Sequence, residues 1–264
     1  MPTPFLSSEE FDERAHQLYQ AGKYNLALKL LRAGLFRYPD SADLWVGMGY
    51  VRVAREEFAW AAHCFAQAVQ LDPGHEDGWV GRGEMWLRFG QFEHAEACFG
   101  TVDELGLGAG LETGMTIGRA LYREGFFQQA RERFEGLARV HPSDPEPTAG
   151  LGYTLYALGE HDEAQKALRR ALEMEPELHD ARVQLSHLLH ERGDPAGALR
   201  ELELIPADGF LDADSVNRCL ELRRGLYGPS GDARELALRA RLGELEGELD
   251  EIDRLLAEVE AGAG

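Results

Sequence analysis

The feature of this chain that most restricts its fold is an internal period of 34 residues. Alanine recurs at intervals of 34, 34, 35, 34 and 34 residues, at Ala27, Ala61, Ala95, Ala130, Ala164 and Ala198. A second small residue, a large apolar residue and, in five repeats of six, a glycine follow the same register. A period of about 20–50 residues is typical of a solenoid, in which stacked neighbours bury one another's apolar faces.

Each period predicts two helices joined by a short turn. In the second repeat, apolar and small residues recur at spacings of three and four from Trp45 to Arg52, and again from Ala61 to Ala68. Pro73 then ends the repeat, because proline has no N–H for the helix ladder. Such short helix pairs cannot bury their own apolar faces, so at least about three must stack.

The motifs WVGMG, FAWAAHCFAQA and LDP in the second repeat, and LGYTLYALGEHDEAQKALRRALEMEP in the fifth, resemble the tetratricopeptide repeat. The resemblance implies an all-α, right-handed solenoid of helix-turn-helix repeats, and a role as a non-catalytic adaptor or scaffold that binds proteins. The last repeat is expected to be degenerate, because Pro195 stands where an aromatic residue is usual. We divide the chain into a tail at 1–7 and repeats at 8–41, 42–75, 76–110, 111–144, 145–178 and 179–212.

Two further helices are expected after the repeats. Residues 213–227 predict a capping helix over the last repeat. Residues 233–260 predict a long helix with apolar residues at alternating spacings of four and three, as in a heptad seam: Leu238, Leu242, Leu245, Leu249, Ile252, Leu256 and Val259. We favour a helix that folds back on its own solenoid; a homodimer, pairing with another chain's helix, and fraying are the alternatives.

In the tetratricopeptide repeat family, one stripe of each first helix lines a concave groove that binds peptides or partner helices. The second residue of every repeat lies on this stripe and is acidic: Glu9, Asp43, Asp77, Glu112, Glu146 and Asp180. This row of acidic residues favours a partner with basic flanks. The alternative interpretation is that the acidic residues serve the helix dipole and that the apolar ones pack between neighbouring first helices. The predicted partner-binding residues are Tyr19, Val46, Tyr50, Val53, Val80, Glu84, Leu87, Met115, Arg119, Tyr122, Tyr153 and Tyr156.

Some members of this family hold a peptide carboxylate with a clamp of Lys, Asn and Arg on the same stripe. Asp12, His16, Gly47, Asp77 and Gly81 occupy the corresponding positions here. Without cationic or amide side chains there, this clamp is not expected.

The first three repeats also resemble the translocator chaperones of type III secretion. The stretches LYQAGKYNLALKLLRAGL and WVGMGYVRVAREEFAWAAHCFAQAV carry this resemblance. It implies an alternative function, in which the chain is a cytoplasmic chaperone that keeps an apolar client segment from aggregating.

Composition limits the classes of partner. The chain has 47 acidic against 27 basic residues, a formal net charge of -20. This balance argues against binding nucleic acid or an anionic membrane surface. The start lacks the pattern of a secretory signal, and Cys64, Cys98 and Cys219 form no CxxC pair. We therefore expect a reducing cytoplasm.

No motif predicts catalysis, a cofactor or a metal. The stretch HLLHE at 187–191 matches neither zinc-binding helix pattern, and the glycine-rich GLGAG at 106–110 follows no predicted strand and precedes no GK[ST]. We interpret GLGAG as the hinge between the third and fourth repeats. An enzyme or a metal protein is the least favoured alternative.

Overall fold

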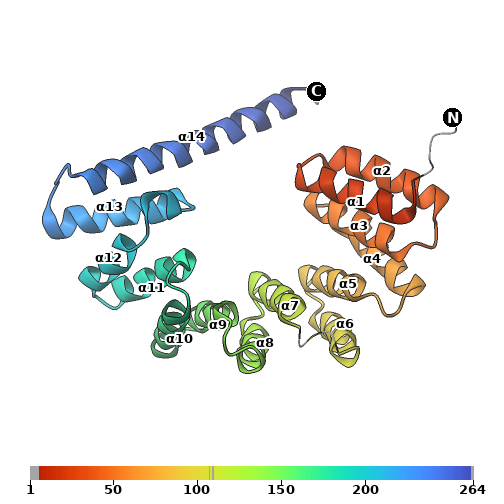
Figure 1. Ribbon diagram of the computed structural model, residues 1–264, viewed down its shortest axis with the longest axis horizontal. Helices are drawn as coiled ribbons and strands as arrows, with labels where there is room; N and C mark the ends of the chain where they lie inside the picture. The colour runs from red at the N-terminus through yellow and green to blue at the C-terminus, as the bar shows by residue number, and fades with distance from the viewer. Residues whose placement is uncertain (1–5, 107, 109, 263–264) are drawn as a thin grey trace. The chain divides into compact units, whose positions relative to one another are not determined.

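The computed structural model describes residues 6–106, 108 and 110–262, with side chains as far as Glu248. Within that part the chain is helical and contains no strand (Figure 1). The predicted all-α fold is confirmed. The chain divides into an N-terminal body, Met1–His141, and a C-terminal body, Pro142–Gly264.

The N-terminal body contains eight α-helices in its described residues. They are α1 (Ser8–Gln20), α2 (Tyr24–Arg37), α3 (Ala42–Ala54), α4 (Phe58–Leu71), α5 (Glu76–Arg88), α6 (Phe92–Glu104), α7 (Leu111–Arg123) and α8 (Phe127–Val140). The C-terminal body contains α9 (Pro145–Ala157), α10 (His161–Met174), α11 (His179–Glu191), α12 (Pro195–Glu203), a 3-10 turn at Ala207–Gly209, α13 (Ala213–Tyr227) and α14 (Ala233–Gly262). None of the helices in the described residues is both long and apolar enough to cross a bilayer.

The odd-numbered helices from α1 to α13 start 34 or 35 residues apart, and each packs against the even-numbered helix that follows it. The helix α13 starts one period after α11, so the rhythm of helix starts continues past the last predicted repeat. The division of residues 8–212 into six repeats stays our proposal for the organisation of the chain.

The turn inside each helix pair explains the recurring glycine. Gly22, Gly90, Gly125, Gly159 and Gly193 all have positive φ, which costs a residue without a Cβ little. The turn closes with a backbone bond of the Schellman type; for example, the N–H of Lys23 donates to the carbonyl of Leu18 at 2.8 Å. Glu56 adopts the same conformation, with φ of 58°, and is the one non-glycine residue with positive φ in the described residues.

Large apolar residues of the second helices fill space that glycines leave open on the first helices. A Cβ added to Gly49 would lie 2.6 Å from the Phe65 ring, and one added to Gly81 in the next repeat would lie 2.4 Å from the same ring. Phe65 is fully buried. The same fit recurs where Gly83 meets Phe99. A glycine of a first helix and an aromatic residue of a second helix therefore fit together in these joints.

Tryptophans connect the start of one repeat to the end of the one before it. The indole N–H of Trp45 donates to the carbonyl of Pro39 at 3.1 Å. Trp79 makes the equivalent bond to Pro73 at 2.9 Å. The tryptophan and the closing proline in the sequence pattern are thus two halves of one contact.

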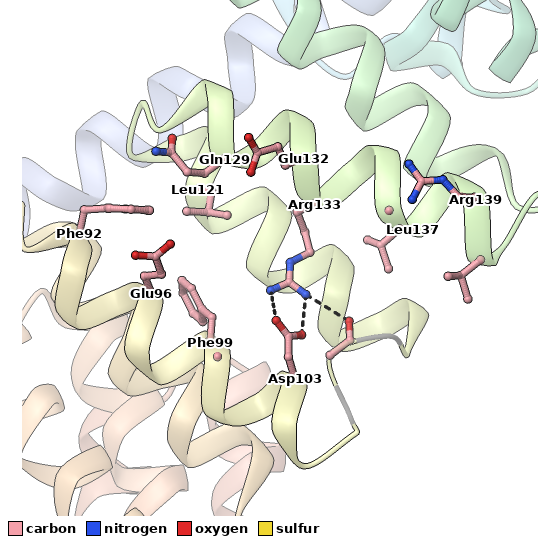
Figure 2. A pocket seen from close by; sticks show the side chains of 14 residues that line it. Phe92, Glu96, Phe99, Asp103, Leu121, Gln129, Glu132, Arg133, Leu137 and Arg139 are labelled. Atoms are coloured by element: carbon pink, nitrogen blue, oxygen red, sulfur yellow. Dashed lines mark hydrogen bonds and ion pairs between the residues drawn. The ribbon is translucent and has the colours of Figure 1, made fainter.

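The joint between α6 and α7 is looser than the joint between α4 and α5. The helix α4 packs directly on α5, whereas α6 and α7 have few close contacts. The connection between them contains the extra residue of the one 35-residue interval. A cleft of about 600 Å³ opens between α6 and α8 (Figure 2). Arg133 ties its two sides together by donating to both oxygens of Asp103, at 2.8 and 3.0 Å, and to the carbonyl of Gly108.

The described part of α14 packs on its own body. Leu238 and Leu245 are buried in a cluster that includes Val216 and Cys219 of α13. The guanidinium of Arg241 donates to the carbonyl of Phe210 at 3.1 Å. The first half of the heptad seam therefore folds back as we favoured, whereas the side chains of Leu249, Ile252, Leu256 and Val259 lie outside the described residues. Pairing of α14 with another chain stays a prediction.

Candidate functional site

A pocket of about 300 Å³ lies on the first helices of the N-terminal body. The helices α1, α3 and α5 pack side by side there. We call this cavity the groove pocket. Its lining residues are Asp12, Ala15, His16, Tyr19, Leu31, Asp43, Val46, Gly47, Tyr50, Val51, His75 and Asp77.

Three carboxylates give the groove pocket its negative charge. Asp12 of α1 reaches across to α3, where a Cβ added to Gly47 would lie 2.8 Å from its Oδ1. Asp43 and Asp77 stand in the first turns of α3 and α5. None of the described residues lining the pocket is a lysine or an arginine. The glycine at position 47 thus makes room for a carboxylate that no lysine or arginine of the lining neutralises.

Burial and mutual repulsion raise the pKa of two of these carboxylates. For Asp12, burial is the largest cause of the higher pKa, the charge of Asp43 adds to it, and His16 and His75 act in the opposite direction. For Asp77, burial again comes first; His75 lowers the pKa, while neighbouring carboxylates including Asp43 raise it. The pocket therefore holds negative charge that favours a cation.

His75 fixes the position of Asp43. Its Nδ1 accepts the N–H of Gly78 at 3.3 Å and so caps α5, while its Nε2 lies 3.1 Å from Oδ1 of Asp43. This arrangement fits the tautomer with the proton on Nε2. The helical stripe did not predict His75, because this residue lies one position before α5. The signal that was present is a histidine at an N-cap position directly before an acidic first turn.

Two tyrosines contribute aromatic surface to the groove pocket. The Tyr50 ring packs edge-on against the Phe65 ring, with centroids 5.2 Å apart. Burial, with the charges of Asp77 and Glu84, raises the pKa of Tyr50, so its hydroxyl stays neutral at physiological pH. Tyr19 lies against Tyr24 with centroids 5.6 Å apart. Half-buried tyrosines held in this way offer contact area without much loss of side-chain freedom.

The structure brings only some of the predicted partner-binding residues together. Tyr19, Val46 and Tyr50 line the groove pocket. Val80, Leu87 and Met115 are exposed by 5% or less and belong to the core, because α5 packs against α3 and α7 packs against α5. Val46 is also largely buried, with 6% exposure. The apolar strip that we expected along the groove is therefore mostly covered.

The remaining predicted residues lie apart from the groove pocket. Val53 is half-buried beside the Phe65 cluster, Tyr122 packs against Phe127, and Arg119 is exposed. Glu84 forms an ion pair with Arg123 at 3.4 Å, and burial raises its pKa. Tyr153 and Tyr156 belong to the C-terminal body, where the Tyr156 hydroxyl donates to Glu191 at 2.6 Å.

The described residues offer little for bond chemistry. No group of three or more His, Cys, Asp or Glu side chains in that part of the chain is arranged to hold a metal ion. Cys64, Cys98 and Cys219 are buried free thiols, and burial raises the pKa of Cys64 and Cys219 to about 11. A thiol with such a pKa is a poor nucleophile near neutral pH.

Comparisons with solved structures agree with the fold. A tetratricopeptide repeat protein from Parabacteroides merdae is 15% identical with a TM-score of 0.61, over 89% of this chain and 97% of that one. The type IV pilus biogenesis factor PilW is 15% identical with a TM-score of 0.64, over 76% and 93%. The C-terminal part of a repeat protein from Cytophaga hutchinsonii is 17% identical with a TM-score of 0.59, over 89% and 95%. At these identities the likeness concerns the fold alone.

Comparisons of sequence supply the family. No curated protein matches the chain. Two family models, both described as the tetratricopeptide repeat, match residues 13–59 and 46–99, and residues 121–177 and 155–216. These matches cover both bodies and most of the predicted repeats. Together with the helix pairs and their glycine joints, they show that the chain belongs to the tetratricopeptide repeat family.

Proposed function

We propose that this chain is a protein-binding adaptor that holds a basic segment of its partner in the groove pocket. The observation that carries the proposal is the combination of three carboxylates and two tyrosines in one cavity whose described lining has no lysine or arginine. A lysine or arginine of the partner would supply the missing positive charge. The family fold supports protein binding in general.

Electrostatics favour a basic partner over a neutral one. The raised pKa values of Asp12 and Asp77 mean that the folded chain keeps these charges at a free-energy cost. A bound ammonium or guanidinium group would offset that cost and lower both pKa values. Binding should therefore weaken with added salt, as is usual for partly exposed charges.

The tyrosines add a contact that does not depend on the net charge. A cation over an aromatic face gains roughly 0.5–2 kcal/mol, depending on how far it is desolvated. Tyr19 and Tyr50 line the same cavity as the carboxylates. The partner's basic side chain would thus be held by charge at its tip and by ring contacts along its stem.

We favour an adaptor over a chaperone for an unfolded client. A client-holding chaperone needs a broad exposed apolar surface, whereas Val80, Leu87 and Met115 are buried. The surface that stays accessible in the groove pocket is polar and aromatic. This composition suits a defined segment with charged side chains.

Binding of a model peptide tests the proposal. The probe is a fluorescent peptide of alternating alanine and lysine, with the glutamate version as its counterpart. Asp43→Asn should weaken binding of the lysine peptide by about five- to tenfold, because it removes one exposed carboxylate of the pocket. Glu13→Gln is the matched control, since Glu13 is an exposed carboxylate of α1 that does not line the pocket. Equal effects of the two substitutions in fluorescence anisotropy would contradict the assignment.

The same titration repeated over pH gives a second readout. Carboxylates bind the peptide when ionised, and Asp12 and Asp77 have a higher pKa than the ordinary 3.8. Affinity should therefore fall at a higher pH than an ordinary aspartate would cause. Asp12→Asn should flatten the acidic part of this profile.

A further inference from the structure

The cleft between α6 and α8 is separate from the groove pocket and shares no residue with it. Figure 2 shows Phe92, Glu96 and Phe99 on the α6 side, Gln129, Glu132 and Arg133 on the α8 side, and Leu121 of α7 between them. The second helices of the third and fourth repeats thus form its walls. A cavity of about 600 Å³ has room for the side chains of one helical face.

Each wall carries a glycine in the interior of its helix. Gly100 lies in α6 and Gly136 in α8, and both line the cleft. Glycine is a poor helix former, so its presence inside a helix calls for a packing reason. The joint glycines have one, because Gly83 faces the Phe99 ring. A Cβ added to Gly100 or Gly136 would meet nothing within 4 Å.

The open space above these glycines fits a group that comes from outside the chain. A glycine in a helix wall lets another backbone approach closely. A groove between two helices takes a third helix by fitting side-chain ridges into it. Phe92 and Val140, which are both accessible, supply apolar contact area at the cleft, while the buried Phe99 and Leu137 form its floor.

The charges of the cleft specify the partner further. Glu96 and Glu132 are exposed carboxylates, one on each wall, and neither has an ion pair or a side-chain hydrogen bond among the described residues. Arg133 is already engaged by Asp103, and the other cationic residue of the described lining is Arg139, so the two unpaired carboxylates outnumber it. Unpaired negative charge on both walls therefore favours a lysine or arginine on the incoming helix.

We propose that the cleft between α6 and α8 is a docking site for one amphipathic helix of a partner protein. The helix packs small and apolar side chains against Gly100 and Gly136 and places a basic side chain beside Glu96 and Glu132. The cleft lies beside the connection that contains the extra residue of the one 35-residue interval. It is a second binding surface, independent of the proposed function of the groove pocket.

The test uses a designed helical peptide and filled-cleft variants. The probe is a labelled peptide of about 18 residues, long enough for a helix in water. It has alanine and leucine on one face and lysine beside them; its counterpart carries glutamate for lysine. The lysine peptide should bind the full chain at least about tenfold more tightly than the glutamate peptide. Failure of the lysine peptide to bind, or equal binding of both, would overturn the proposal.

Substitution of the wall glycines locates the peptide. The double variant Gly100→Leu/Gly136→Leu fills the cleft and should weaken binding of the lysine peptide by at least about tenfold. The melting temperature of the variant should stay at or above that of the parent protein, because both positions are open. Gly243→Leu is the matched control, since Gly243 is a helix-interior glycine of α14 with equally open surroundings. Unchanged affinity in the double variant overturns the site.

A carboxylate variant separates this inference from the proposed function. Asp43→Asn alters the groove pocket alone and should leave the affinity of the helical peptide unchanged. If Asp43→Asn abolishes binding of this peptide while the filled cleft does not, the peptide occupies the groove pocket and the cleft is not its site. Glu96→Gln/Glu132→Gln should lower the preference for lysine over glutamate.

Discussion

At the scale of single residues, Glu56 departs from the turn chemistry of its neighbours. Five equivalent positions hold glycine at positive φ, and Glu56 adopts φ of 58° in their place. A left-handed conformation costs a residue with a Cβ roughly 1–2 kcal/mol. The backbone of the turn is evidently fixed by the helices on either side, since it is the same with and without glycine.

Replacing Glu56 by glycine should stabilise the chain. The relief of strain exceeds the extra freedom that glycine gains in the unfolded chain, about 0.5–1 kcal/mol. We expect a net gain of roughly 0.5–1 kcal/mol, measured by urea denaturation of the two proteins. Glu57→Gly is the control: Glu57 has negative φ and pairs with Arg52 and Arg55, so that variant should lose stability. A loss of stability in Glu56→Gly would contradict this view of the turn.

At the scale of the helices, glycines serve two opposite purposes within α5 and α6. Gly83 has the Phe99 ring against it, so that an added Cβ would lie 2.3 Å from Cε1 of that ring. Gly100, one residue after Phe99, has open space above it. Glycine content alone therefore says nothing about packing; the facing residue decides.

The two glycines should respond to alanine with opposite signs. Gly83→Ala forces an overlap in the joint and should destabilise the chain by about 1–3 kcal/mol, as overpacked cores do. Gly100→Ala should stabilise it by up to about 1 kcal/mol through helix propensity. Thermal unfolding followed by circular dichroism measures both. Combining Gly83→Ala with Phe99→Leu should recover part of the loss, and absence of any recovery would show that the joint is not the cause.

Much of the fold could be predicted from the sequence, because the residues that keep the period are the ones that make the joints. Gly49 marks where two helices approach closely, Phe65 fills the space between them, and Pro73 ends the repeat. The composition of the groove could not be predicted equally well. A helical wheel places Val80, Leu87 and Met115 on a stripe, but the distance between neighbouring first helices decides whether that stripe is covered. The cleft beside α6 depends on how α6, α7 and α8 pack against one another, which the period does not reveal.

At the scale of the whole molecule, the question is whether α14 packs on its own chain or pairs with another one. Its leucine stripe suits packing on the same chain and pairing with a second one, so the sequence left both open. In the structure Leu238 and Leu245 are buried against α13 and its neighbours. The described half of the seam is therefore used within the C-terminal body.

Ending the chain at Gly231 should weaken the C-terminal body and leave the N-terminal body unchanged. The truncation removes two buried leucines, worth roughly 3–6 kcal/mol together, and repeat proteins transmit such losses mainly to neighbouring repeats. Hydrogen exchange should then rise in α11 to α13 but not in α1 to α6. Leu238→Ala is the milder variant, with Leu236→Ala at an exposed position as its control.

Light scattering of the full-length and shortened chains tests whether α14 forms a dimer. If truncation halves the mass per particle, the full-length chain pairs through α14.

The Phe65 ring seated between Gly49 and Gly81 has a consequence for how such a chain grows. Each module carries a ring that packs against a glycine of the next module, and a glycine that accepts the ring of the previous one. Duplication of a gene segment of one full period copies both, so lengthening by whole modules needs no compensating change elsewhere. An insertion of any other length would move the glycines of one module out of register with the rings of the next.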